Sequence, residues 1–181
     1  VVRCDSEDGA YQLVRYLLEL GHRRIAVLTG PEGTSTADDR LAGYLRAISE
    51  AGIQNNNNWM LRGSFTQTSG YELANQVINQ KPRPTALFAA NNFIAIGAMK
   101  AFQGFDLSVP EDIALVGFDD LPEALVMFPF LTVAAQPAYE MAQEATRLLL
   151  ARIAGEGPEE HQEIVLPTEL IIRQSSGRAL V

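Results

Sequence analysis

The sequence predicts an α/β fold built on a doubly wound, mostly parallel β-sheet, and three features of the chain support this. Short apolar runs at 25–28, 86–90 and 113–118 lack polar alternation, which is typical of parallel strands buried on both faces. Stretches with helical spacing separate these runs, and such alternation favours right-handed crossovers that cover both faces of a sheet. Polar residues gather where the runs end, at the edge where ligands bind in such sheets.

Helices are expected where apolar residues recur every three or four positions. Four such residues between Leu13 and Leu18 indicate a first helix that stops at Gly21. Further helices are expected over 36–51, 69–79, 93–102 and 138–153, and short strands around 60–61, 163–166 and 170–172. The last helix ends at a Gly- and Pro-containing break, and the residues after the last strand are expected to fray.

Composition narrows the classes of function. The 181 residues contain 14 Lys and Arg against 22 Asp and Glu, which gives a net charge of −8. Since duplex binding needs clustered basic residues, and the densest basic spot is only 22–24, the chain alone is not expected to bind nucleic acid. A single cysteine excludes an intrachain disulfide. No apolar run reaches a membrane-spanning length and the start does not read as a signal peptide, so cytoplasmic residence is the default expectation.

Seven short motifs follow one another along the chain: GHRRIA at 21–26, RLAGY at 40–44, PTALF at 84–88, Asn91 with GAM at 97–99, VPEDIALVGFDD at 109–120, LT at 131–132 with QP at 136–137, and LP at 166–167 with Leu170 and Arg173. Each motif is weak alone, but in this order and spacing they make the chain resemble the LacI/GalR family of bacterial transcriptional repressors. The VPEDI segment ahead of GFDD separates repressors of this kind from their sugar-transport relatives.

The resemblance implies a periplasmic-binding-protein-like fold of type I, of which this chain would be a truncated, flavodoxin-like lobe with attached pieces. Residues 1–6 would end the N-terminal lobe and form the first crossover, 7–133 would form the C-terminal lobe, 134–166 would be a helix and strand of the N-terminal lobe, and 167–181 would return to the C-terminal lobe and form the tail. A helix-turn-helix headpiece and most of the N-terminal lobe are expected to be absent. The apolar face of the 138–153 helix would then need cover from packing back, from swapping between chains, or from a partner.

Arg40 and Asp119 are the first candidates for ligand contact. The planar fork of Arg40 can hold two oxygens of a diol or carboxylate, although an ion pair with Asp38, Asp39 or Asp119 would explain it equally well. Asp119 can accept two hydroxyl hydrogens at the end of a strand, or serve only as a cap or turn residue. The resemblance implies that both face the effector.

Asn91 and Phe65 are the next candidates. Asn91 can donate and accept hydrogen bonds to a sugar hydroxyl, but it can also cap the helix near Phe93, a role that Asn92 could fill as well. Phe65 offers a stacking face in a loop, or else belongs to the core. The resemblance favours ligand contact for both residues.

Thr34 and Thr36 flank a predicted helix start. Backbone N–H groups there could bind an anion, but capping by a hydroxyl is the preferred interpretation. The resemblance places them in a loop that varies within the family and could tune the choice of effector.

An apolar cluster formed by Met127, Phe128 and Phe130 would need cover if it were exposed. The resemblance implies that it joins Phe93 and Ile96 in a symmetric dimer interface, whereas core packing remains the alternative.

No residue set supports enzyme chemistry. His22 and His161 have no companions at metal-ligand spacing, Cys4 reads as a small buried residue, and no phosphate-binding or nucleophile motif occurs. We therefore expect no cofactor, no metal and no catalysis, but an allosteric sensor of a small polar effector such as a sugar, in a homodimer that contacts operator DNA only through the headpiece and does not contact a membrane. A periplasmic sugar-binding protein is the alternative, and an enzyme on a flavodoxin-like sheet is a third, less favoured possibility.

Overall fold

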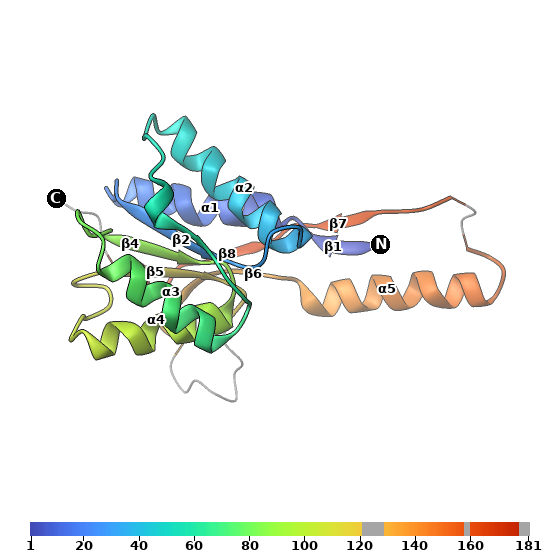
Figure 1. Cartoon of the computed structure of the whole chain (residues 1–181). Helices are drawn as coiled ribbons and strands as arrows, with labels where there is room; N and C mark the ends of the chain where they lie inside the picture. The colour runs from blue at the N-terminus through green and yellow to red at the C-terminus, as the bar shows by residue number, and fades with distance from the viewer. Residues whose placement is uncertain (121–128, 158–159, 178–181) are drawn as a thin grey trace.

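A computed structural model describes residues 1–120, 129–157 and 160–177 of the chain. It shows a body with a central sheet and a long arm that extends from one end of it (Figure 1). The body holds a six-stranded sheet in the order β3-β2-β4-β5-β6-β8. Its strands are β2 (Ile25–Thr29), β3 (Met60–Arg62), β4 (Ala86–Ala89), β5 (Ala114–Phe118), β6 (Thr132–Ala135) and β8 (Glu169–Ile171).

Strands β2 to β6 are parallel, and β8 runs antiparallel along the edge beside β6. Every residue of β2, β4 and β5 is buried, as their continuous apolar runs predicted. The strand order reverses between β2 and β4, and ligands bind beyond the carboxyl ends of strands at such a point. The predicted α/β fold with a doubly wound, mostly parallel sheet is therefore confirmed.

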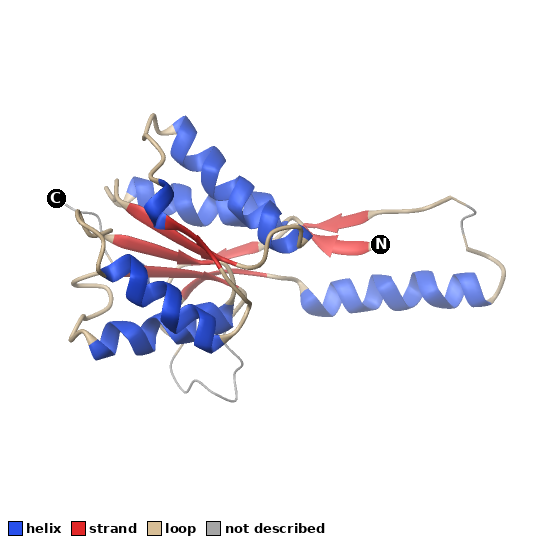
Figure 2. Ribbon diagram, viewed as in Figure 1, coloured by secondary structure: helices blue, strands red, loops and turns tan. Residues whose placement is uncertain are grey.

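Two helices cover each face of this sheet (Figure 2). Helices α1 (Ser6–Glu19) and α2 (Ser35–Glu50) pack together on one face, and α3 (Gln67–Ile78) and α4 (Asn92–Gly104) pack together on the other. Short 3-10 helices, η1 (Asn57–Trp59) and η3 (Gln174–Ser176), complete the body. The predicted helices are all present, with ends that differ from the expected ones by a few residues.

Glycines allow the helices of each pair to approach closely. A Cβ atom on Gly43 of α2 would lie 2.1 Å from the carbonyl oxygen of Glu7 on α1. A Cβ atom on Gly97 of α4 would lie 2.1 Å from the carbonyl oxygen of Gln67 on α3. Since a carbon atom cannot approach backbone so closely, both helix crossings depend on glycine.

The arm consists of α5 (Ala138–Ile153) and a two-stranded parallel sheet of β1 (Val2–Cys4) and β7 (Ile164–Leu166). Sequence patterning gave no sign of β1, because three residues are too few to show a period. Helix α5 has no buried residue, although its ends match the expected 138–153. Its apolar face was expected to be covered, but contact with the rest of the chain leaves it only half-buried, as at Met141, which packs against the core of the body, and at Leu148. No helix among the described residues has the length and apolar character that a membrane span requires.

Candidate ligand-binding site

The candidate residues gather where the strand order reverses. Arg40 comes from α2, Asn91 follows β4 and Asp119 follows β5, so these three side chains meet at the carboxyl edge of the sheet. Phe65 lies in the loop between β3 and α3, at the same edge. Parallel strands release their next residues at one edge, which explains the positions of Asn91 and Asp119, and α2 carries Arg40 to the same edge.

Arg40 is buried, with 4% of its surface exposed. Its Nη1 donates to the carbonyl oxygen of Ala90 at 2.6 Å and lies 3.7 Å from Oδ2 of Asp119. Burial lowers the pKa of the guanidinium, and the charge of Asp119 acts in the opposite direction. Of the three expected ion-pair partners, Asp119 is the one found, since Asp38 pairs with Arg62 and Asp39 lies beside Arg3.

One nitrogen of this guanidinium, Nε of Arg40, is buried without a hydrogen-bond partner in the described part of the chain. A buried donor without a partner is costly, and such groups often mark the place of a ligand or an ordered water. The Cys4 thiol also lies close enough to the guanidinium to raise its pKa, so Asp119 and Cys4 both help to hold the buried charge of Arg40.

Asp119 has a left-handed backbone with φ of +67°, which Asp tolerates better than most residues. Its N–H donates to Ala134 at 3.0 Å, and its Oδ1 accepts a hydrogen bond from Nε2 of Gln136. Its side chain is 24% exposed, so the carboxylate remains open to solvent on one side. The next residue, Asp120, forms a two-point ion pair with Arg173, at 2.8 and 2.6 Å.

Asn91 serves as the N-cap of α4, because its Oδ1 accepts from the N–H of Ile94 at 2.8 Å. Capping by Asn91, the alternative that the sequence left open, is thus observed. Asn92 does not cap the helix but donates to the carbonyl oxygen of Asp120 at 2.9 Å. Capping uses only the oxygen of the Asn91 amide. Its nitrogen makes no hydrogen bond within the described residues, so a donor remains at this edge of the sheet.

The Phe65 ring is half-buried and packs against both core clusters. It covers the end of β2, where a Cβ on Gly30 would lie 2.4 Å from the ring. One part of the Phe65 ring therefore belongs to the core, and the rest lies at the edge of the candidate site.

Thr34 occupies the N-cap position of α2, but its hydroxyl makes no capping hydrogen bond, and Thr36 is exposed. The preferred interpretation of hydroxyl capping was therefore wrong. Asp38 instead accepts from the N–H of Gly33 at 3.0 Å, which orders the loop from inside the first turn.

Two residues of this edge had no role assigned from sequence, namely Gln136 at the end of β6 and Arg173 beyond β8. Both belong to motifs that make the chain resemble the LacI/GalR family, so their place in these motifs could have identified them as site residues. Their partners, Asp119 and Asp120, lie far away along the chain, so spacing could not reveal the contacts.

The predicted dimer residues that the structure describes differ in exposure. Phe93 at the start of α4 is 46% exposed, and Ile96 and Phe130 are half-buried. Met127 and Phe128 fall outside the described residues. Exposure of a large ring at Phe93 is consistent with an interface. Core packing, the alternative for the 127–130 cluster, stays open, because Phe130 is its one described member and is half-buried.

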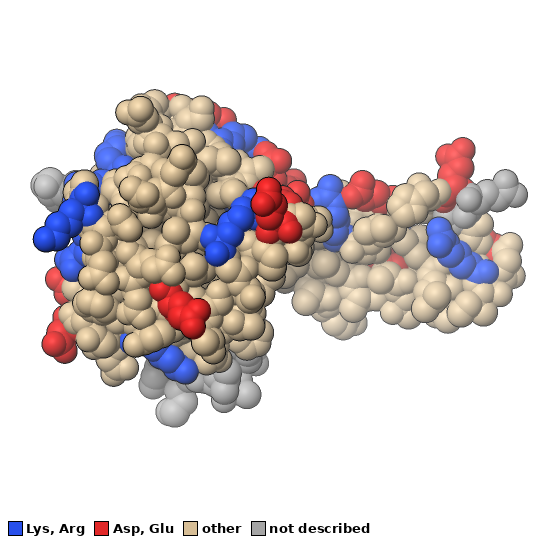
Figure 3. Space-filling model, in the orientation of Figure 1, with Lys and Arg blue, Asp and Glu red and all other residues tan. Residues whose placement is uncertain are grey.

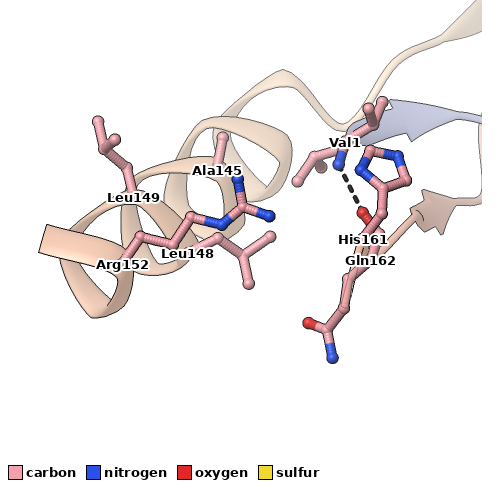
Figure 4. A pocket seen from close by; sticks show the side chains of 8 residues that line it. Val1, Ala145, Leu148, Leu149, Arg152, His161 and Gln162 are labelled. Atoms are coloured by element: carbon pink, nitrogen blue, oxygen red, sulfur yellow. Dashed lines mark hydrogen bonds between the residues drawn. The ribbon is translucent and has the colours of Figure 1, made fainter. Parts of the chain in front are cut away.

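Away from this edge, the described surface carries charges of both signs and a groove in the arm. Basic and acidic side chains are interspersed over the face in Figure 3. A groove lies in the arm between α5 and the β1–β7 sheet (Figure 4), lined by Val1, Val2, Ala145, Leu148, Leu149, Arg152, His161 and Gln162. Neither Arg40 nor Asp119 lines this groove. The described residues include no group of three or more His, Cys, Asp or Glu side chains that could hold a metal ion.

Comparison with known proteins gives consistent matches. The model of the periplasmic binding protein-like domain matches residues 14–176. The HTH-type transcriptional repressor PurR of Klebsiella pneumoniae subsp. pneumoniae is 40% identical over 168 residues, which are 93% of this chain and 49% of that protein. The chain spans about half the length of the curated relatives it matches.

Two solved structures show the same likeness. A regulatory protein of the LacI family from Chloroflexus aggregans superposes with a TM-score of 0.87 at 38% identity, covering 98% of this chain and 63% of that one. A complex of the transcriptional regulator CelR with cellobiose gives a TM-score of 0.89 at 36% identity, covering 96% and 53%. The matching proteins are regulators rather than enzymes, in agreement with the lack of catalytic motifs.

Proposed function

Because this chain belongs to the periplasmic binding protein-like domains of LacI-family transcriptional regulators, we propose that it senses a small polar effector in a bacterial repressor. The observation that carries this proposal is the Arg40–Asp119 pair at the reversal of strand order. It presents a partly exposed carboxylate acceptor beside a buried, fixed positive charge within one small area. These groups suit a ligand with several hydroxyls.

A sugar or sugar derivative is the effector class that we propose. Asp119 would orient ligand hydroxyls, the Asn91 nitrogen would donate, and the Phe65 ring would cover an apolar face of the ligand. Thr34 and Thr36 would line the entrance and contribute to the choice of effector. The CelR relative was solved with cellobiose, which supports the class without naming the ligand of this protein.

The arm would complete a second lobe, and the effector would bind between the two lobes. Residues 1–6 and 134–166 would then belong to that lobe, and 7–133 with 167–181 to the lobe described above. An effector shifts the arrangement of lobes only by binding one arrangement more tightly than the other. In a homodimer formed through Phe93, Ile96 and the 127–130 region, this shift would reach DNA-binding headpieces on two half-sites. Such a regulator would act in the cytoplasm.

The alternative, a periplasmic sugar-binding protein for transport, shares the fold but is not favoured, because the relatives above are transcriptional repressors and regulators.

A thermal-shift screen of the full-length protein against sugars, nucleobases and sugar phosphates tests the proposal. A compound at a hundred times its Kd stabilises the folded state by about 2.7 kcal/mol, which raises the melting temperature measurably. We expect a sugar-like compound to do so and to change operator retention in a gel-shift assay. Duplex binding by residues 1–181 alone would contradict the assignment of DNA contact to a separate headpiece.

A further inference from the structure

Body and arm are joined by three connections, which meet at Cys4. The first runs from β1 into α1, the second from β6 into α5, and the third from β7 to β8. Cys4 pairs in register with Leu166 on the third connection, and the N–H of Asp5 donates to the Leu166 carbonyl oxygen at 2.8 Å. The Cys4 thiol donates to Oε1 of Gln136, on the second connection, at 3.0 Å. Cys4 is 3% exposed, so these contacts are shielded from water.

The Gln136 amide continues this contact into the candidate site. Its oxygen accepts from the Cys4 thiol while its nitrogen donates to Oδ1 of Asp119. An amide has one accepting end and one donating end, so a donor at Oε1 favours the orientation that turns Nε2 toward the carboxylate. The opposite orientation would place an oxygen against the negative charge of Asp119. The other carboxylate oxygen faces Arg40 at 3.7 Å.

We propose that the Cys4 thiol and the Gln136 amide are positioning groups that hold Asp119 against Arg40 and couple this pair to the connections between body and arm. This inference deepens the proposed function, because the pair would be the effector contact. A movement of β1 relative to β6 would separate Cys4 from Gln136, release the amide and loosen Asp119. Effector binding and lobe arrangement would thereby share one chain of hydrogen bonds.

A purely steric role of Cys4 would predict similar effects for Cys4→Ser and Cys4→Ala. Serine and alanine are both smaller than cysteine, so a purely steric role is lost in both variants. A hydroxyl still donates to Gln136, whereas a methyl group does not. Comparison of Cys4→Ser with Cys4→Ala therefore separates a hydrogen-bonding role from a steric one.

The readout is the exchange rate of the Arg40 Nε proton in ¹⁵N-labelled protein without ligand, measured by NMR. This proton is buried and lies next to the pair, so it exchanges when the guanidinium separates from its surroundings. Its resonance is assigned from its absence in Arg40→Lys. We expect Cys4→Ala to raise the rate by about fivefold, the factor that corresponds to one net hydrogen bond. Cys4→Ser is expected to stay close to the wild-type rate.

The second arm of the experiment tests the relay as a unit. Gln136→Met keeps the length of the side chain but cannot bridge Cys4 and Asp119, so it is expected to match Cys4→Ala. The double variant is expected to be no faster than either single variant. Gln103→Met, on the exposed end of α4, is the matched control and is expected to leave the rate unchanged.

Equal rates in Cys4→Ser and Cys4→Ala, or additive effects in the double variant, would overturn the proposal. Amide spectra and melting curves report whether each variant stays folded. Since no ligand is present, a failure here leaves the proposed effector binding intact, and a negative ligand screen leaves the relay intact.

Discussion

The guanidinium group of Arg40 lies over the ring of Phe118, 3.7 Å from its centroid. Phe118 ends β5 and is fully buried, and Asp119 follows it directly. The same strand end therefore supplies both the aromatic face that carries the cation and the carboxylate that balances it. Cation–π contacts of this kind contribute about 2 kcal/mol when they are desolvated. Arg40 is thus part of the folded core as well as the candidate site.

A planar guanidinium is needed for this arrangement. Arg40→Lys keeps the charge but loses the planar group that stacks on Phe118 while its Nη1 contacts both Ala90 and Asp119. We expect a loss of about 1–3 kcal/mol in the free energy of unfolding, measured by urea titration. Arg24→Lys, at an exposed arginine, serves as the control. An equal effect of the two substitutions would show that the buried geometry of Arg40 has no special importance.

The α1–α2 crossing gives a test of packing. In Gly43→Ala the new methyl group meets the backbone of α1 at 2.1 Å, so the helices must separate. We expect destabilisation of about 1–3 kcal/mol or more, as for other overpacked cores. Gly104→Ala places its methyl group in open space at the end of α4 and is expected to be neutral or slightly stabilising. Comparable melting temperatures for both variants would argue against the close crossing.

His22 gives a pH dependence. Burial lowers the pKa of its imidazole, whose Nδ1 lies 3.0 Å from Oγ1 of Thr85. The unfolded chain then binds a proton more readily than the folded one. The stabilising contribution is therefore complete above the unfolded pKa of about 6.5 and declines as the pH falls below it.

We expect urea titrations between pH 8 and pH 5.5 to show a smaller loss of stability in His22→Gln than in the wild type. The difference between the two pH profiles gives the contribution of His22 to stability, because all other groups titrate in both proteins. Parallel pH profiles for the two proteins would contradict a lowered pKa at this position.

The proposed dimer interface can be tested with two phenylalanines of similar exposure on the same helix and just beyond it. Phe93 is 46% exposed at the start of α4, and Phe105 is 43% exposed after its end. Phe93→Glu buries a charge in the proposed interface and is expected to weaken the dimer at least about tenfold in sedimentation equilibrium. Phe105→Glu is expected to leave association unchanged. Identical sedimentation of both variants would place the interface elsewhere.

The sequence was sufficient for the sheet and the helices because their signals are local. The runs that became β2, β4 and β5 are apolar throughout, and the 138–153 pattern matched α5 to the residue. The placement of Asn91 and Asp119 at one edge also followed from sequence, since strand ends share an edge, whereas Asp119 was only one of three possible partners for Arg40. Predicting the hydroxyl cap at Thr34 failed because Asp38 orders that loop from a later position.

Local sequence patterns could not predict contacts between segments that lie far apart along the chain. Gln136 reaches back to both Cys4 and Asp119, and Arg173 reaches Asp120, but no period or spacing encodes these pairs. Strand β1 was missed for a related reason, because its three residues become a strand only through their pairing with β7.

The central claim is that Asp119 contacts a small polar effector, and calorimetry tests it most directly. A compound found in the ligand screen is titrated into full-length wild type, Asp119→Asn and Asp106→Asn. Asp106 is a matched control, since it is exposed and its φ of +52° is left-handed like that of Asp119. Asparagine tolerates this backbone at both positions, and melting curves report whether Asp119→Asn stays folded without the carboxylate that faces Arg40. We predict at least about a tenfold loss of affinity for Asp119→Asn, the effect of losing a charged hydrogen bond, and no change for Asp106→Asn. Equal affinity in all three proteins would contradict the account.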